Sequence, residues 1–164
     1  MNSEDILNWI ILNPEFAGLA MFAIGFLESF IISGIIWPSI ILLLFAIGLS
    51  EADIGLIYIC LGAGLGSWIG DLCSFYIGLF FGPKIKSTQF MSKREDVFLK
   101  GKKFFNKYGW GGIVIGRLVP AIRPFIPFIA GLSSMKNITF LFSSVAACII
   151  WTVALAILVI GIDN

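Results

Sequence analysis

The sequence predicts an all-α integral membrane protein in which two re-entrant helical hairpins alternate with two membrane-spanning helices. Hydrophobic residues make up 59% of its 164 residues and charged residues only 13%, whereas charged residues make up about 25% of an average soluble domain. The hydrophobic residues form four long continuous blocks rather than alternating with a period of two, which favours helices over a β-barrel. Two of these blocks are interrupted by prolines and charges.

The first block, residues 16–49, is too long for one membrane span and too short for two spans with a turn. A spanning helix needs about 20 residues, and this block also contains Gly34 and Pro38. Irregular backbone at membrane depth is tolerated only where protein buries it or water reaches it. We therefore predict a re-entrant hairpin over residues 16–49, broken at Pro38.

Residues 54–81 and 138–162 each have the length of one spanning helix. In the first of them Gly62, Gly66 and Gly70 recur every four residues, which makes one helix face smooth. We interpret this face as a packing surface for another helix or hairpin. Asp71 lies one position off the face and could meet an arginine across it.

A strongly basic stretch, residues 83–108, separates the second block from the third. By the positive-inside rule we expect it to lie in the cytoplasm. Its phenylalanines and lysines suit an amphipathic helix on anionic headgroups, so nucleic acid is not an expected partner. The stretch contains the basic residues Lys84, Lys86, Lys93, Arg94, Lys100, Lys102, Lys103 and Lys107.

The third block, residues 110–132, carries two arginines and three prolines within a short segment: Arg117, Pro120, Arg123, Pro124 and Pro127. Each proline removes a backbone donor and clashes with the preceding turn, so a continuous helix is not expected. We predict a second re-entrant hairpin over residues 110–132, with breaks at Pro120 and Pro124.

Similar strings end the two broken blocks, Phe45-Ala-Ile-Gly-Leu-Ser50 and Phe128-Ile-Ala-Gly-Leu-Ser133. Each follows a proline and precedes a plain spanning block. The chain, residues 1–164, is therefore predicted to be one membrane domain built from two hairpin-plus-span units. The span between the hairpins would invert the second unit, giving the inverted repeat found in transporters.

Four charged residues lie inside apolar segments: Glu28, Asp71, Arg117 and Arg123. A charge at the bilayer centre costs roughly 2.5–3.5 kcal/mol or more, so such residues usually pair or face a cavity. One interpretation is structural: two ion pairs hold hairpins and spans together. The other is functional: Arg117 and Arg123 bind a phosphate. Glu28 and Asp71 would then take part in proton coupling or ion pairing.

Several classes of chemistry have no basis in the sequence. It contains no histidine, which removes histidine-dependent proteases, lipid phosphatases and metal sites. Cys60, Cys73 and Cys148 are spaced neither as metal ligands nor as a disulfide framework, and we interpret them as buried hydrophobic residues. We therefore expect no metal, no cofactor and no enzymatic activity. The acidic N-terminus does not have the pattern of a secretory signal, so we expect it to be retained.

The sequence resembles the DedA family, also described as SNARE-associated Golgi or VTT-domain proteins. The resemblance covers most of the chain from Glu28 to Trp151, and the segment between the two arginines is its most specific part. It rests on Glu28, Pro38 and Gly48, on Gly66-Ser-Trp-Ile-Gly-Asp71 with Tyr76, Gly78 and Gly82, and on Phe105-Asn-Lys-Tyr-Gly109, Arg117-Leu-Val-Pro-Ala-Ile-Arg123, Ala130-Gly131 and Met135.

The resemblance implies two oppositely oriented hairpins that meet at the membrane centre. It also implies transport of a lipid phosphate: bacterial members, in the cytoplasmic (inner) membrane, resemble proton-coupled flippases for undecaprenyl phosphate or transporters of other phospholipids, and eukaryotic relatives resemble lipid scramblases. Ile40 stands where the family often has a second acidic residue, which weakens the case for proton coupling. The sequence stops at Asn164, where relatives usually continue into a further span, so a homo-oligomer could complete the enclosure. A non-transporting membrane scaffold and a small-ion or solute exchanger are the alternatives.

Overall fold

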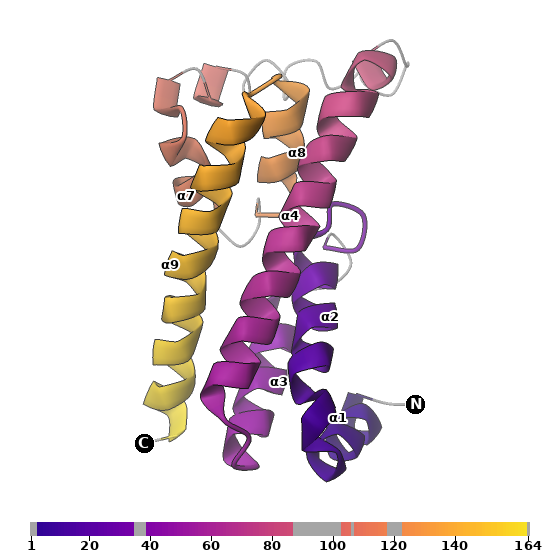
Figure 1. Cartoon of the computed structure of the whole chain (residues 1–164), viewed down its shortest axis with the longest axis vertical. Coiled ribbons are helices and arrows are strands. Elements are labelled where there is room, and N and C mark those ends of the chain that lie inside the picture. The colour runs from indigo at the N-terminus through magenta and orange to yellow at the C-terminus, as the bar shows by residue number, and fades with distance from the viewer. Residues whose placement is uncertain (1–2, 35–38, 87–102, 106, 118–122, 164) are drawn as a thin grey trace. The chain divides into compact units, whose positions relative to one another are not determined.

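A computed structural model describes residues 3–34, 39–86, 103–105, 107–117 and 123–163. All regular secondary structure in these residues is helical (Figure 1), which confirms the all-α prediction. Pro38, Pro120 and most of the basic stretch lie outside the described residues. The elements are α1 (Ser3–Leu12), η1 (Pro14–Phe16), α2 (Ala17–Ser29), α3 (Ser39–Glu51), α4 (Leu56–Lys86), α7 (Gly111–Arg117), α8 (Phe125–Leu132) and α9 (Asn137–Asp163).

Two helices are long and apolar enough to cross a membrane, over Leu56–Phe81 of α4 and Asn137–Gly161 of α9. α9 has almost the bounds expected from the sequence. α4 continues beyond residue 81 and passes through Pro83 before it ends at Lys86. The apolar pattern stops at Phe81, but a helix can extend into water, and one proline removes only one backbone hydrogen bond.

Each broken block contains two short helices rather than one long helix. In the first block α2 and α3 contact each other, and in the third block α7 and α8 do so. The helical breaks thus occur in the two blocks where length, glycine and proline predicted them. That these pairs enter and leave the membrane on one side, with opposite orientation, stays a prediction.

The chain divides into two compact units, which we call unit 1 and unit 2. Unit 1 comprises residues 1–70 and 148–164, and unit 2 comprises residues 71–147, so α4 and α9 each contribute to both. Each unit has its own apolar core. The fully buried side chains include Met21, Leu42, Leu49, Ile59 and Val159 in unit 1 and Phe75, Ile113, Ala130, Phe140 and Ala147 in unit 2.

In unit 1, α2 packs directly on the glycine face of α4. A β-carbon on Gly62, Gly66 or Gly70 would collide with the carbonyl oxygens of Gly18, Phe22 and Phe26 in turn. Because each step of four residues along α4 matches a step of four along α2, the two helices run in the same direction in close contact. The packing interpretation of these glycines is confirmed.

In unit 2, α8 contacts α4 closely at two further glycines, Gly78 of α4 and Gly131 of α8. A β-carbon on Gly78 would collide with the Phe128 carbonyl oxygen, and one on Gly131 would collide with that of Phe75. The ring of Phe75 in turn stacks on Phe140 of α9, with ring centroids 4.0 Å apart. α4 therefore contacts both α8 and α9 around Phe75.

Helices α3 and α8 end in the same hydrogen-bonded cap. At the end of α3, the N–H of Asp53 bonds to Ser50 O and that of Ile54 to Leu49 O; at the end of α8, the N–H of Ser134 bonds to Gly131 O and that of Met135 to Ala130 O. This pattern is a Schellman motif, whose left-handed position usually holds glycine. Here it holds Asp53, with φ 58°, and Ser134, with φ 57°.

The similar strings of the two blocks do not occupy equivalent places in these caps. Ser50, which ends the first string, stands three positions before the left-handed Asp53, whereas Ser133 directly precedes the left-handed Ser134. The two helix ends therefore match in backbone geometry but not residue by residue along the strings. The inverted repeat itself stays a prediction.

Candidate functional site

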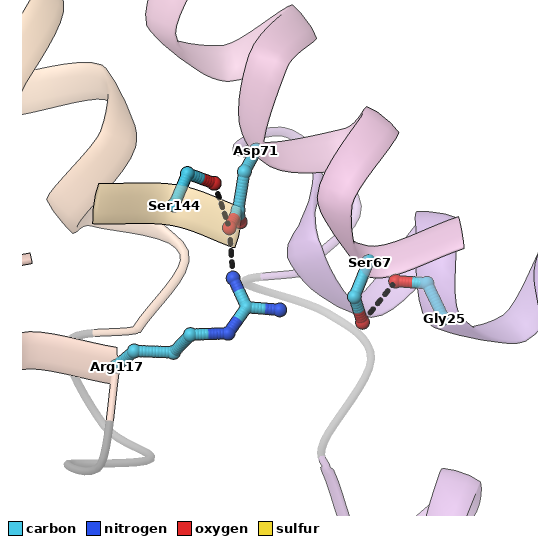
Figure 2. A network of polar contacts seen from close by, with 5 residues as sticks. All are labelled: Gly25, Ser67, Asp71, Arg117 and Ser144. Carbon is cyan, nitrogen blue, oxygen red and sulfur yellow. Dashed lines mark hydrogen bonds and ion pairs between the residues drawn. The ribbon is translucent and has the colours of Figure 1, made fainter. Parts of the chain in front are cut away.

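The centre of the candidate site is a buried ion pair in unit 2. Nη1 of Arg117, the last residue of α7, contacts Oδ2 of Asp71 in α4 (Figure 2). Arg117 is 4% exposed and Asp71 is 1% exposed. Since both groups are withdrawn from solvent, their attraction is stronger than that of a surface pair, and removing one partner would leave a buried charge.

Ser144 of α9 reaches the same carboxylate oxygen. Its Oγ lies 3.3 Å from Oδ2 of Asp71 (Figure 2), and the side chain is fully buried. An ionised carboxylate only accepts hydrogen bonds, so the serine hydroxyl is the donor. One oxygen atom of α4 thus receives a guanidinium from α7 and a hydroxyl from α9.

The α4–α9 contact that positions Ser144 extends over at least one helical turn. Phe75 lies four residues after Asp71, and Phe140 lies four residues before Ser144, so each pair shares a helix face. The Phe75 and Phe140 rings stack with an interplanar angle of 10°. The two contacts together show that α4 and α9 are antiparallel here, in the register that brings Ser144 to Asp71.

Arg117 is positioned by close packing between α7 and α8. A β-carbon on its neighbour Gly116 would lie 2.5 Å from Cδ1 of Ile126, so the Ile126 side chain sits directly on the glycine. Arg117 also ends its helix, where a cation interacts favourably with the partial negative charge of the last carbonyls. Its placement therefore depends on Gly116, on α8 and on Asp71.

Arg123 lies at the other end of the break between α7 and α8 and is 3% exposed. Pro124, the N-cap residue of α8, has a φ of −66°, and the Arg123 carbonyl accepts a 3.4 Å bond from the Ile126 N–H. Pro124 and Pro127 carry no N–H, which reduces the number of backbone donors needing a partner at this helix start. Pro124 thus lies where α8 begins, and the missing N–H groups suit this helix start to apolar surroundings.

Glu28 lies in the last turn of α2 and is 2% exposed. It belongs to unit 1, whereas Asp71, Arg117 and Arg123 belong to unit 2. Of the four charges identified in the sequence, the structure therefore joins Arg117 with Asp71, places Arg123 in the same unit, and buries Glu28 in the other unit.

Ser144 was not among the residues that the sequence singled out. Serine is uncharged, and in an apolar helix its hydroxyl usually bonds to the backbone of its own helix. A signal was present, because Ser143 and Ser144 stand together in block 138–162, which contains no charged residue. Among the described residues, no group of three or more His, Cys, Asp or Glu side chains could hold a metal ion.

Comparison with known proteins places this architecture in a family. The model of the VTT domain matches residues 37–161. This chain belongs to the VTT-domain (DedA) family. The predicted family is thus confirmed, and the matched region contains Asp71, Arg117, Arg123 and Ser144 but not Glu28.

Relatives of this VTT-domain protein include proteins that are described as membrane proteins. It is 24% identical to inner membrane protein YabI of Escherichia coli over 146 residues, which are 88% of this chain and 57% of YabI. It is 34% identical to protein DedA of Escherichia coli over 85 residues, 51% of this chain and 38% of DedA. A membrane protein of Buchnera aphidicola is 30% identical over 130 residues, 78% of this chain and 50% of the relative.

The chain spans about half the length of the curated relatives it matches. No solved structure matches it. Together with the two membrane-length helices, the family assignment identifies a membrane protein.

Proposed function

We propose that this VTT-domain protein moves a lipid phosphate, undecaprenyl phosphate or a phospholipid, across the membrane. The observation that carries the proposal is the pair of arginines at the two ends of the α7–α8 break. Arg117 and Arg123 are both almost fully buried in unit 2. Buried guanidinium groups are costly in a membrane protein, and those that occur usually pair with another charge or a backbone carbonyl and mark the path of a substrate or ion.

The chemistry of the guanidinium group favours a phosphate ligand. Its planar fork donates two parallel hydrogen bonds to two phosphate oxygens, and in a low-dielectric site such charge-assisted bonds are strong. The headgroup would bind at the two arginines while the acyl or prenyl tails stay in lipid. Transport of this kind requires no covalent step, so the proposal includes no enzymatic activity.

The carboxylates have separate roles in the proposal. Asp71 holds Arg117 when no phosphate is bound, since it contacts the Arg117 Nη1 directly. Glu28, a buried carboxylate on α2, takes part in proton coupling or in ion pairing during transport. Membrane lipids are then the partners of the protein, with a second copy of the chain as a further partner.

Transport in liposomes tests the proposal. The full chain is reconstituted with fluorescent undecaprenyl phosphate in one set and with a fluorescent glycerophospholipid in another, and the labelled lipid exposed on each leaflet is followed. We expect Arg117→Ala and Arg123→Ala to abolish transport of the accepted lipid, and Arg→Lys variants to retain part of it. Lys136→Ala, which removes an exposed cation, is the matched control. Full transport by both alanine variants would overturn the arginine assignment.

The Arg117–Asp71 pair also favours one other function, a non-transporting membrane scaffold in which the pair locks α7 to α4. Charge reversal, Asp71→Arg with Arg117→Asp, separates the two proposals. An ion pair that only holds α7 to α4 works whichever helix carries the positive charge. A phosphate site needs the cation on α7. Recovery of both folding and function in the cell by the reversed pair would support the scaffold.

A further inference from the structure

We propose that Ser144 is a positioning residue of the phosphate site: it holds the Asp71 carboxylate when a lipid phosphate replaces that carboxylate on Arg117. The inference rests on the proposed function and deepens it. Through its hydroxyl, Ser144 makes Asp71 an exchangeable counter-ion of Arg117 rather than a fixed one.

Two donors meet at one carboxylate oxygen of Asp71, which suits the replacement of Asp71 by a phosphate on Arg117. Oδ2 of Asp71 receives Nη1 of Arg117 from α7 and the Ser144 hydroxyl from α9. The two donors come from different helices, so Arg117 can move away from the carboxylate without moving Ser144. The stacked Phe75 and Phe140 rings, one turn away, keep α9 on α4 in the register that this bond needs.

Exchange has an energetic requirement that Ser144 meets. A phosphate that takes Arg117 separates a buried carboxylate from its cation, and losing a partner in such a site carries a large penalty. A hydroxyl that keeps donating to the carboxylate lowers this penalty, because hydrogen bonds to charged groups are stronger than those between neutral groups. Ser144 therefore makes phosphate binding tighter without touching the phosphate.

The neighbouring residue supplies a matched control. Ser143 is also buried, at 3% exposed, but its Oγ donates to the Thr139 carbonyl oxygen at 2.7 Å, within α9 itself. Ser143→Ala and Ser144→Ala each remove one buried hydroxyl from consecutive positions of the same helix. The two differ in whether the hydroxyl reaches Asp71.

The experiment measures binding of dihexanoyl phosphatidic acid, a short-chain lipid phosphate, to the full chain in detergent. Tryptophan fluorescence reports binding, and thermal unfolding without ligand reports stability. We expect Ser144→Ala to weaken binding roughly three- to tenfold, and Ser143→Ala to leave it within about twofold. Asp71→Asn should tighten binding because it removes the competing anion, and adding Ser144→Ala to Asp71→Asn should have no further effect.

Each outcome decides a different point. If the wild-type chain neither binds the probe nor moves lipid phosphate in liposomes, the proposed function fails. If the wild type binds and Ser144→Ala matches Ser143→Ala, or if Ser144→Ala weakens binding equally in the Asp71→Asn background, the role of Ser144 is overturned. Should Ser144→Ala not fold, Ser144→Cys, which keeps the size and a weaker donor, is measured instead. It should give an intermediate loss of affinity, and unchanged affinity would also refute the proposal.

Discussion

Arg117 at the end of α7 and Asp71 within α4 form an ion pair that is almost fully withdrawn from solvent. The pair joins one end of the α7–α8 break to a membrane-length helix. Its two partners contribute to stability only together, because either one alone is a buried charge.

We therefore expect Asp71→Ala to lower the free energy of unfolding by about 3–5 kcal/mol. Replacing both partners with leucine should recover most of this loss, since an apolar pair leaves no charge buried. Thermal unfolding of the purified chain in detergent measures both effects. If the double-leucine variant folds well but fails to move lipid phosphate, the pair serves transport; if it folds and transports normally, the arginine has no transport role.

Gly131 and Phe75 show how closely α8 approaches α4, and a side chain at Gly131 should prevent that approach. Gly131→Ala places a β-carbon against the Phe75 carbonyl oxygen, so we expect a loss of about 1–3 kcal/mol in unfolding free energy. Gly161→Ala is the control, because a β-carbon there meets nothing within 4 Å and alanine favours helix. Equal melting temperatures for the two variants would contradict the close packing.

The two Schellman caps offer a stabilising change. Asp53 and Ser134 adopt left-handed backbone that costs a non-glycine residue about 1–2 kcal/mol. Asp53→Gly and Ser134→Gly should each raise the unfolding free energy by about 0.5–1 kcal/mol, after the greater freedom of glycine in the unfolded chain is subtracted. Ser133→Gly should instead destabilise, since Ser133 is right-handed, with φ −78°. Melting temperatures in detergent compare the three variants.

The Phe75–Phe140 stack should couple α4 to α9 energetically. In a double-mutant cycle with Phe75→Leu and Phe140→Leu, we expect a coupling of about 0.5–1.5 kcal/mol in unfolding free energy. Both single variants should also weaken binding of dihexanoyl phosphatidic acid, because the stack sets the register between Ser144 and Asp71. Additive effects in the cycle would show that the rings do not act as a pair.

Much of the fold follows from features that one sequence displays directly. Block length and proline position predicted two broken blocks and two spanning helices, because lipid forces each segment to satisfy its own backbone hydrogen bonds. The spacing of Gly62, Gly66 and Gly70 predicted a close helix contact, since residues four apart share a face. The end of α4 could not be predicted in this way, because hydrophobicity ends where the membrane ends and not where the helix does.

For the candidate site, the sequence by itself determined which charges are costly enough to need an explanation: Arg117, Arg123, Asp71 and Glu28. It could not decide which carboxylate would hold which arginine, because pairing depends on where separate helices bring their side chains. The tertiary structure decided that Asp71 holds Arg117, through the glycine contacts of α4 with α8 and of α7 with Ile126. It also decided that Ser144 of α9 completes the group. Burying a serine costs so little free energy that its presence in an apolar segment does not indicate a functional role. That role depends on the partner that the folded chain brings to it.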